Sequence, residues 1–349
     1  MTPILPVDPR SPQPDVIARA ALCLRDGGLV GFPTETVYGL GANALDAGAV
    51  ARIFTAKQRP ASDPLIVHLA SAADLPRVAV HAPPAAFTLA ERFWPGPLTL
   101  VLPRATAVPP AVTAGGATVA VRVPRHPVAL ALIAAAGVPV AAPSANLFSR
   151  PSPTTAAHVL EDLDGRIDLL LDGGPCEVGV ESTVLDLTTT PPRVLRPGAV
   201  TIEMLRGVLP DVRLGARQAG SGVPASPGML DTHYAPKATL TLYAGDPGAR
   251  RARMLADVRA ATSAGTRVGA LVTDDDVPAF AGAGADTATL GAAGDLPEAA
   301  VRLYAALRAL DAAGVSVIVA AAVTSDDHLG AALADRLGRA ASGRVITVH

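Results

Sequence analysis

Short apolar segments, each bounded by proline or glycine, recur along the whole chain and limit what it can fold into. The 349 residues include 33 prolines and 32 glycines, so turns are frequent and regular elements are short. Runs of about five apolar residues predict buried strands, and apolar residues at positions i, i+3 and i+4 predict helices. Strands mixed with helices indicate an α/β fold, and the length allows two domains with ample core.

The chain up to about residue 206 is predicted to form one α/β domain with a mixed sheet. Half of all residues are hydrophobic but only 3% are aromatic, so alanine and valine carry the core. The second of its helices has Asp46 as the expected N-cap and Val50, Ile53 and Phe54 as its apolar face. We expect strands at residues 29–33, 65–69, 98–102, 119–123, 138–142, 169–172, 182–187 and 193–195, and helices at 15–26, 46–60, 127–136 and 155–162.

The sequence changes in character after residue 206. Residues 211–227 are polar, rich in glycine, serine and alanine, and show no apolar periodicity, which is typical of a linker. We therefore predict an N-terminal domain at 1–206, a linker at 207–238 and a smaller, Rossmann-like parallel α/β domain at 239–349. Its first strand–helix turn lacks the GxGxxG pattern, so we expect no dinucleotide there. In this second domain we expect strands at 240–243, 268–273, 287–290 and 315–321, and helices at 248–261, 297–313 and 329–340.

Charge and cysteine content argue against several classes of protein. The net charge of −2 provides no overall basic field for nucleic acid. The two cysteines, Cys23 and Cys176, form no CxxC pattern, which favours a reduced, cytoplasmic setting, and the N-terminus lacks the pattern of a signal peptide. Residues 127–145 form the longest uncharged run, but Gly137 and Pro139 interrupt it. We therefore expect a helix followed by a buried strand there and no membrane partner.

Basic and small polar side chains occur at places where an α/β fold can bring them together. Lys57 and Arg59 lie at the end of a predicted helix, where the helix dipole alone would favour cations. Ser144 and Asn146 follow a predicted buried strand, where they could also form an ordinary polar turn. Arg122 lies inside an apolar strand and needs a partner, because an unpaired buried charge is costly. Together these groups suit a nucleoside triphosphate and a small anion.

Other candidates are weaker when each is considered alone. Thr34 and Thr36 directly follow a strand, where α/β proteins often bind ligands, but turn chemistry also explains them. His68 in an apolar strand is more often a buried core residue than a ligand-binding group. Residues 274–276, three aspartates, are interpreted as a solvated loop. The sequence has no Walker-type phosphate loop, no HExxH zinc pattern and no GxSxG elbow.

Eight ordered segments between residues 25 and 200 carry a family resemblance. They are FPTETVYGLG at 32–41, KQRP at 57–60, PLIVH at 64–68, WPGPLT at 94–99, VAVRVP at 119–124, PSAN at 143–146, EST at 181–183 and LRPG at 195–198. With these segments the chain resembles the YrdC-like family. The SPGM at 226–229 and HYAPK at 233–237 resemble its long, two-domain form, the threonylcarbamoyl-AMP synthases. The resemblance implies a twisted mixed-sheet domain, a linker that covers the active site, and a C-terminal Rossmann-like domain.

The resemblance also implies a nucleotidyltransferase reaction and its partners. L-threonine, bicarbonate or CO2, and ATP would condense to L-threonylcarbamoyladenylate and pyrophosphate. A separate transfer complex would then modify an adenosine next to the tRNA anticodon. Mg²⁺ is expected to accompany ATP, with no motif that specifies its protein ligands, and the protein is expected to be a cytoplasmic monomer.

Site residues follow from the resemblance position by position. Lys57, Arg59 and Arg122 would carry the catalytic charge stabilisation. The L-threonine site would comprise Thr34, Thr36, His68, Arg122, Ala142 and Ser182, with Arg122 on the carboxylate. The ATP site would comprise Lys57, Arg59, Asp63, Thr118, Ser144, Asn146, Ser152, Arg196 and Tyr234, with Tyr234 reaching over the nucleotide from the linker.

Asp63 departs from the family pattern, which usually has asparagine at this position. A carboxylate beside a triphosphate repels it unless Mg²⁺ bridges the two or Arg59 pairs with the carboxylate.

Three alternatives stay open at this point. The related domain of hydrogenase-maturation carbamoyltransferases belongs to longer chains with zinc-finger-like cysteines, which two lone cysteines do not match. A tRNA-binding module without chemistry would show salt-sensitive RNA affinity and no pyrophosphate release. A regulatory protein would bind ATP regardless of threonine.

Overall fold

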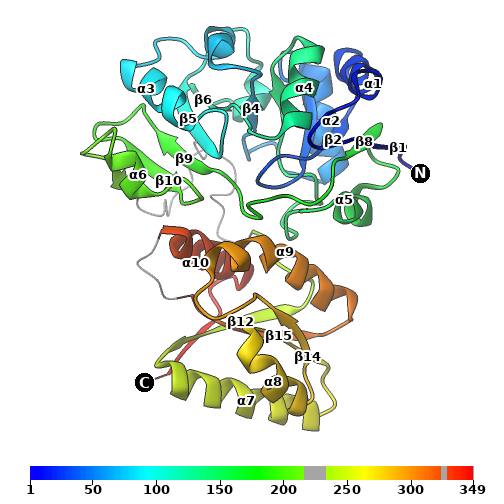
Figure 1. Cartoon of the computed structure of the whole chain (residues 1–349), viewed down its shortest axis with the longest axis vertical. Helices are drawn as coiled ribbons and strands as arrows, with labels where there is room; N and C mark the ends of the chain where they lie inside the picture. The colour runs from blue at the N-terminus through cyan, green and yellow to red at the C-terminus, as the bar shows by residue number, and fades with distance from the viewer. Residues whose placement is uncertain (216–232, 324–327, 349) are drawn as a thin grey trace. The chain divides into compact units, whose positions relative to one another are not determined.

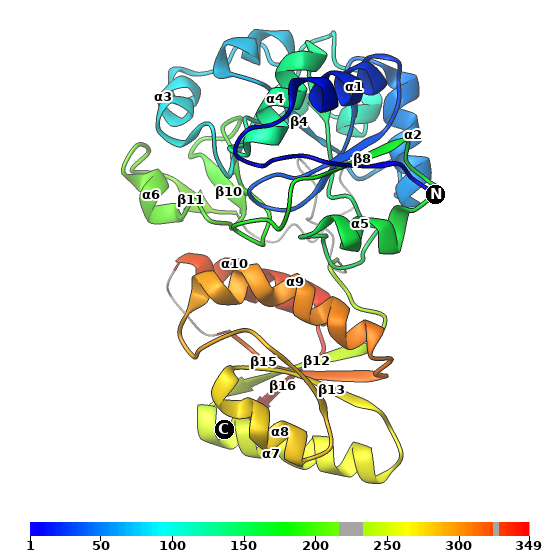
Figure 2. The ribbon, with the colours of Figure 1, turned by 45° about the vertical axis from the view of Figure 1, so that its right-hand side comes forward.

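The computed structural model describes residues 1–215, 233–323 and 328–348 and divides them into two compact units. Unit 1 contains residues 1–148 and 153–215, and unit 2 contains residues 149–152 together with the described residues from 233 onward. Figures 1 and 2 show that each unit is a sheet flanked by helices, as expected for an α/β protein. Much of the predicted linker at 207–238, including 226–229, lies outside the described residues.

Unit 1 is built on a mixed sheet, and its described strands number eleven in the order β1-β8-β2-β3-β7-β4-β6-β5-β9-β10-β11. The strands are β1 Ile4–Pro6, β2 Val30–Phe32, β3 Gly39–Asn43, β4 Ile66–His68, β5 Leu98–Pro103, β6 Thr118–Arg122, β7 Val140–Ala141, β8 Leu169–Asp172, β9 Thr183–Asp186, β10 Arg193–Arg196 and β11 Arg213–Leu214. The helices are α1 Pro14–Arg25, α2 Ala47–Lys57, α3 Pro84–Phe93, α4 Pro127–Ala136, α5 Ala156–Leu163 and α6 Ile202–Arg206, with 3-10 turns η1 Ala72–Arg77 and η2 Pro110–Thr113.

Two apolar clusters anchor these elements. Ile17 and Leu24 of α1 and Leu132 of α4 pack in one cluster with Phe32 and Leu171 of the sheet. A larger cluster contains the apolar faces of α2, α3 and α5 together with residues of β3, β5 and β6. Burying these small and branched side chains supplies the main stabilisation of the unit.

Helix α2 begins as predicted but ends earlier than predicted. The Asp46 side chain caps it by accepting hydrogen bonds from the backbone N–H groups of Gly48 and Ala49. The sequence predicted a helix that continues to residue 60. The helix ends at Lys57 because Gln58 takes the left-handed conformation, with φ 53°. Arg59 therefore leaves the helix axis and lies in a loop.

Strand β3, at residues 39–43, was not among the predicted strands. Its two glycines, Gly39 and Gly41, hide the strand pattern, and close packing requires the second of them. A Cβ on Gly41 would lie 2.8 Å from the ring of Phe32 and 2.9 Å from Val140, so only glycine fits between them.

Unit 2 has a parallel five-stranded sheet in its described part, in the order β14-β13-β15-β12-β16, which confirms the predicted Rossmann-like character. Figures 1 and 2 show α7 and α8 on one face of this sheet and α9 and α10 on the other. Strand β16 and helix α8 were not predicted. The strands are β12 Thr239–Gly245, β13 Val268–Val272, β14 Asp286–Thr289, β15 Val317–Ala321 and β16 Val345–Val348, and the helices are α7 Pro247–Ser263, α8 Val277–Gly282, α9 Leu296–Ala312 and α10 His328–Ala340, with the turn η3 Asp274–Asp276.

The predicted interpretation of residues 127–145 as a helix and a strand is confirmed by α4 and β7. Among the described residues, no helix combines the length and the apolar character needed to cross a membrane.

Candidate functional site

Arg122 ends strand β6 and is the centre of a buried polar cluster. Its Nη2 lies 2.7 Å from Oε1 of Glu35, and both side chains are almost fully buried. Its Nη1 donates a hydrogen bond to Oγ1 of Thr36 at 3.0 Å, and its Nε donates to the carbonyl oxygen of Gly96 at 3.2 Å. Thus the charge that the sequence placed in an apolar strand has a carboxylate partner, as burial requires.

The turn after β2 presents Thr34 and Thr36 together. Their Oγ1 atoms are 2.9 Å apart, and that of Thr34 donates to the carbonyl oxygen of Val37 at 2.6 Å. The backbone N–H groups of Thr36 and Val37 donate in return to Oγ1 of Thr34, each at 3.2 Å. These bonds fix the turn that carries Glu35, so its carboxylate stays at Arg122.

His68 ends strand β4 and is paired in register with Arg122 of the neighbouring strand. Burial, and to a smaller extent the charge of Arg122, lowers the pKa of His68 to about 3. The imidazole is therefore neutral at physiological pH. Its Nδ1 is buried and has no hydrogen-bond partner among the described residues.

Lys57 joins helix α2 to the loop that contains Ser144 and Asn146. Its Nζ donates hydrogen bonds to the carbonyl oxygens of both loop residues, each at 2.5 Å, and the side chain is buried. The backbone N–H of Phe148 donates to the carbonyl oxygen of Lys57 at 2.9 Å. The sequence expectation that these distant residues meet is therefore correct, and Lys57 holds the loop in shape.

Arg59 and Asp63 form a buried ion pair across the loop that follows α2. Nη2 of Arg59 lies 2.9 Å from Oδ2 of Asp63, and the guanidinium also donates to the carbonyl oxygens of Asp63 and Pro64 at 3.1 and 2.7 Å. Burial raises the pKa of Asp63, and the charges of Arg59, Lys57 and Arg196 oppose that rise. The sequence suggested that the carboxylate of Asp63 would be balanced either by a bridging Mg²⁺ or by Arg59, and the structure shows the pair with Arg59.

Ser182 lies between Thr99 and Arg196. Its Oγ is 2.8 Å from Oγ1 of Thr99 and accepts a hydrogen bond from Nη2 of Arg196 at 3.2 Å. Arg196 also donates from Nε and Nη2 to the carbonyl oxygen of Ser182, at 3.1 and 3.0 Å. Gly198 allows this approach because a Cβ there would lie 2.5 Å from the backbone nitrogen of Thr183.

Strand order and direction bring these groups to one edge of the sheet. Strands β4, β6, β5, β9 and β10 are neighbours in that order. His68, Arg122 and Arg196 end β4, β6 and β10, while Thr99 and Ser182 stand at the start of β5 and β9. Because β4 and β6 are parallel to each other and antiparallel to β5, and β9 is parallel to β5 and antiparallel to β10, all five positions meet at the same edge.

Four other predicted site residues, Thr118, Ala142, Ser152 and Tyr234, do not belong to this edge of the sheet. Thr118 begins β6, four residues before Arg122, which corresponds to about 13 Å along a strand. The backbone N–H of Ala142 donates to the carbonyl oxygen of Ile66 at 2.9 Å, so that group is already used in the sheet. Ser152 and Tyr234 belong to unit 2, so they are described apart from the sites in unit 1.

Within unit 2, Tyr234 is buried and has a positive φ of 62°. Its ring centroid is 5.6 Å from that of Tyr304, and the guanidinium carbon of Arg336 lies 5.6 Å from it. The backbone N–H of Ala235 donates to the carbonyl oxygen of Ser149 at 2.7 Å. The described end of the predicted linker is thus packed into unit 2.

Sequence reasoning missed two residues of the site, Glu35 and Thr99. Both lie inside segments that carried the resemblance, at 32–41 and 94–99. Glu35 lies between Thr34 and Thr36, and Arg122 in its apolar strand needs a carboxylate partner. These two features together could have predicted the ion pair.

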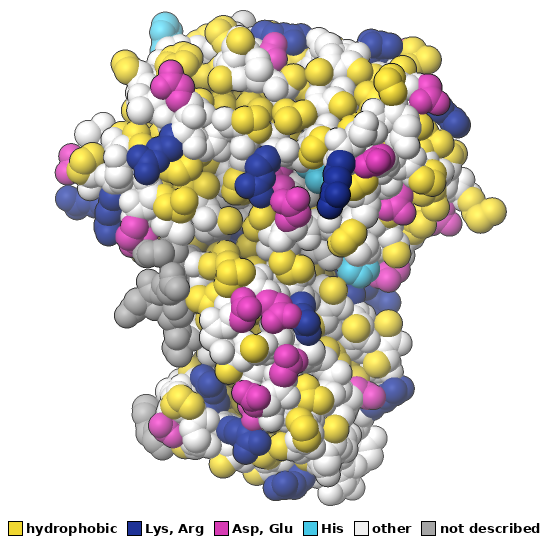
Figure 3. Space-filling model, in the orientation of Figure 1, with side chains coloured by type: hydrophobic (Ala, Val, Ile, Leu, Met, Phe, Trp, Pro, Cys, Tyr) yellow, Lys and Arg dark blue, Asp and Glu magenta, His cyan; other side chains and the backbone are white. Residues whose placement is uncertain are grey.

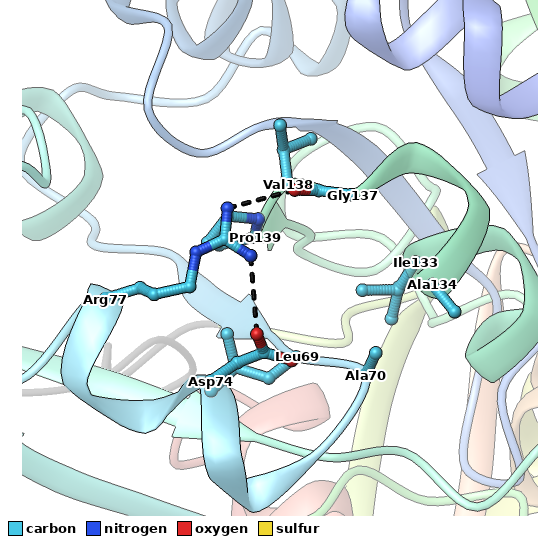
Figure 4. A pocket seen from close by; sticks show the side chains of 9 residues that line it. All are labelled: Leu69, Ala70, Asp74, Arg77, Ile133, Ala134, Gly137, Val138 and Pro139. Atoms are coloured by element: carbon cyan, nitrogen blue, oxygen red, sulfur yellow. Dashed lines mark hydrogen bonds and ion pairs between the residues drawn. The ribbon is translucent and has the colours of Figure 1, made fainter.

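A small cavity in unit 1, drawn in Figure 4, has a volume of about 110 Å³ and is lined by Asp74 and Arg77 of η1, by residues that directly follow β4, and by the end of α4 with the turn after it. Arg77 donates to the carbonyl oxygen of Gly137 at 2.9 Å and pairs with Asp74 at 3.4 Å. The polar groups of this cavity are therefore satisfied by one another, and none of them is a predicted site residue.

Surface charge and metal-binding groups are also informative. On the face drawn in Figure 3, basic and acidic side chains are interspersed with apolar ones, which is unlike the continuous basic surface of a nucleic-acid-binding protein. Within residues 1–215, 233–323 and 328–348, no group of three or more His, Cys, Asp or Glu side chains could hold a metal ion.

Comparison with known proteins gives a family match for each part of the chain. The profile of the Sua5, YciO and YrdC family, described as telomere recombination, matches residues 23–198. A second profile, described as the threonylcarbamoyl-AMP synthase C-terminal domain, matches residues 200–342.

Relatives and solved structures extend the match to nearly the whole chain. The chain is 46% identical to threonylcarbamoyl-AMP synthase of Bacillus subtilis, covering 95% of this chain and 94% of that protein. It is 45% identical to the Pyrococcus abyssi protein of the same name, covering 94% and 95%. The crystal structure of P. abyssi Sua5 complexed with L-threonine superimposes with a TM-score of 0.92 at 44% identity, covering 100% of both chains.

The mixed sheet with a buried basic and hydroxyl-rich edge and the separate parallel α/β unit define a two-domain α/β protein. The chain belongs to the Sua5, YciO and YrdC family, in its long, two-domain form.

Proposed function

We propose that this chain is a threonylcarbamoyl-AMP synthase, a nucleotidyltransferase that makes L-threonylcarbamoyladenylate and pyrophosphate from L-threonine, bicarbonate or CO2, and ATP. The observation that carries the proposal is the sheet edge where His68, Arg122, Thr99, Ser182 and Arg196 meet. Such an edge offers fixed cations and hydroxyl groups to a small amino acid and a phosphate, and the relatives that bear this name support the choice of reaction.

The threonine site centres on Arg122. Its guanidinium makes one hydrogen bond each through Nε and Nη1 and pairs with Glu35 through Nη2, so it retains N–H groups for a ligand carboxylate. Neutral His68 and the Thr34–Thr36 turn offer hydrogen bonds to the amino and hydroxyl groups of the ligand. A crystallised relative bound to L-threonine supports this assignment.

The chemistry needs no enzyme nucleophile. The threonine amine attacks carbon of CO2, loses a proton and forms a carbamate. A carbamate oxygen then attacks the α-phosphorus of ATP, and the bond to the leaving pyrophosphate breaks. The chain would contribute positioning and stabilisation of negative charge, and we propose that Lys57, Arg59 and Arg122 supply the latter.

We also propose that Mg²⁺ enters with ATP and neutralises phosphate charge. The nearby Asp63 is paired with Arg59, and the described residues offer no cluster of acidic, histidine or cysteine ligands, so ATP oxygens and water would supply most of the coordination. The product would pass to a tRNA threonylcarbamoyl-transfer complex. We propose that the chain acts as a cytoplasmic monomer.

Pyrophosphate release tests the proposal. The full chain is assayed with ATP and bicarbonate together with L-threonine, L-serine or no amino acid. We expect release that depends on both threonine and bicarbonate. We expect Arg122→Ala to lower kcat/KM for threonine at least ~100-fold, which is about 2.7 kcal/mol of lost binding to the carboxylate.

A matched control is Arg52→Ala, because Arg52 pairs with Asp168 at 2.7 Å on the surface and touches no proposed site residue. Its activity should equal that of the unchanged protein. Release that is indifferent to threonine, from folded protein, would contradict the proposed function.

A further inference from the structure

Unit 2 contains a cavity of about 340 Å³, and none of its lining residues is assigned to the proposed reaction. It is lined mainly by residues of α7, the end of β13, the turn η3, α8 and the end of β15, among them Arg250, Arg251, Asp275, Asp276, Phe280 and Ala321. Its volume is within the range of pockets that hold small molecules.

The cavity lies at the topological switch point of the parallel sheet. The connections from β12 to β13 and from β13 to β14 run through α7 and α8 on one face, and the later ones run through α9 and α10 on the other (Figures 1 and 2). Strand β15 lies between β13 and β12. After β12 and β13 the chain therefore passes to one face of the sheet, and after β15, which lies between them, it passes to the other face. In open α/β sheets, such a change of direction at the carboxyl ends of neighbouring strands opens a crevice that binds ligands.

The residues that line the cavity form an apolar part, a basic part and an acidic part. Met254, Val272 and Phe280 are buried and give it an apolar floor. Arg250 and Arg251 reach it from the first turns of α7.

On the acidic side, Asp275 and Asp276 line the cavity from η3. Arg250 donates to the carbonyl oxygen of Ala322 at 3.2 Å, which fixes its guanidinium next to β15. Arg251 pairs with Asp276 at a partly exposed position, where such a pair contributes little stability.

We propose that this cavity binds a nucleoside monophosphate. The apolar floor suits a base, Asp275 suits the ribose hydroxyls, and the two arginines suit the phosphate. A dinucleotide is disfavoured because the cavity is small and the β12–α7 turn lacks the glycine-rich pattern that admits a pyrophosphate.

Photolabelling of the full chain with 8-azido-AMP locates the site directly. Peptide mapping should find label in residues 247–280 of unit 2, and unlabelled AMP should prevent that labelling. Labelling confined to unit 1 would overturn the proposal without affecting the proposed synthase reaction. Inorganic phosphate that competes as well as AMP would overturn the nucleoside part of the assignment.

Three variants sharpen the test. Arg251→Ala and, independently, Ala321→Phe, which fills the cavity from the end of β15, should each reduce the unit 2 label at least ~10-fold. Arg253→Ala is the matched control, because Arg253 also lies on α7 and pairs with an aspartate, Asp257 at 3.0 Å, but does not line the cavity. Equal labelling in all three variants, each with an unchanged melting temperature, would overturn the proposal.

Discussion

Nη2 of Arg122 lies 2.7 Å from Oε1 of Glu35, and the two side chains are only 4% and 1% exposed. This pair places a full positive charge inside unit 1, at the edge where neighbouring strands end. A buried cation of this kind is tolerated because Glu35, Thr36 and Gly96 satisfy it. In the proposed function, the N–H groups that these partners leave unused would bind the carboxylate of the ligand.

Replacing Glu35 should be strongly destabilising. Glu35→Ala leaves Arg122 buried without its carboxylate, which typically costs about 3–5 kcal/mol. The free energy of unfolding, measured with a chemical denaturant, checks this. Glu177→Ala is the control, since Glu177 pairs with Arg125 on the surface, and it should change little. Equal effects of the two substitutions would contradict the structural role of Glu35.

Replacing Asp63 should improve ATP binding. Asp63→Asn removes a negative charge close to the proposed phosphate site and frees Arg59 from its ion pair. We expect KM for ATP to fall about tenfold, or about 1.4 kcal/mol, while KM for threonine stays the same. Steady-state kinetics with each substrate varied in turn measures both. A rise in KM for ATP would show that the carboxylate assists nucleotide binding.

Protonation of His68 should make the fold sensitive to acid. Its pKa is about 3 in the folded protein and near 6.5 when unfolded, so the unfolded chain binds the proton first. The stabilisation is complete above pH 6.5 and is lost as the pH falls toward 3, by up to ~1.4 kcal/mol per pH unit.

Unfolding at pH 7 and pH 5 isolates this contribution when the protein is compared with His68→Gln. The unchanged protein should lose about 2 kcal/mol more than the variant between these values. The variant comparison is needed because burial also lowers the pKa of His126. Equal losses in the two proteins would mean that His68 titrates normally.

Lys57 should act on the Ser144–Asn146 loop as well as on ATP. Lys57→Met keeps the length of the side chain but removes the donor to two loop carbonyl oxygens. We expect amide hydrogen exchange of residues 144–148 to accelerate at least ~10-fold and ATP affinity to fall. Lys237→Met, at an exposed lysine of unit 2, is the control. Unchanged exchange in Lys57→Met would show that the loop holds its shape without this contact.

Most of the fold could be predicted because the apolar periodicity is strong where elements are buried. Residues 127–136 were predicted as a helix and form α4 with the same bounds, and Asp46 caps α2 as its side chain suggests. Strand β3 could not be predicted in this way, because its two glycines interrupt the apolar pattern, and Gly41 is required by close packing rather than by hydrophobicity. The early end of α2 depends on one left-handed residue, Gln58, which carries no clear sequence signal.

The candidate site was partly predictable for a related reason. Arg122 in an apolar strand required a partner, but sequence separation hid which carboxylate would meet it, since Glu35 is 87 positions away. Lys57 and the 144–146 loop were correctly expected to meet. The exact bonds, from Nζ to backbone carbonyl oxygens, depend on how α2 packs against the sheet and cannot be predicted from residue type.

The central claim is tested most directly by the product itself. The full chain is incubated with ATP, L-threonine and ¹⁴C-labelled bicarbonate, quenched rapidly, and separated by chromatography with mass detection. The account predicts a labelled adduct with the mass of L-threonylcarbamoyladenylate, formed with an equal amount of pyrophosphate and absent when threonine is omitted or Arg122→Ala is used. Pyrophosphate or AMP formed without a labelled adduct, by protein that is folded, would contradict it.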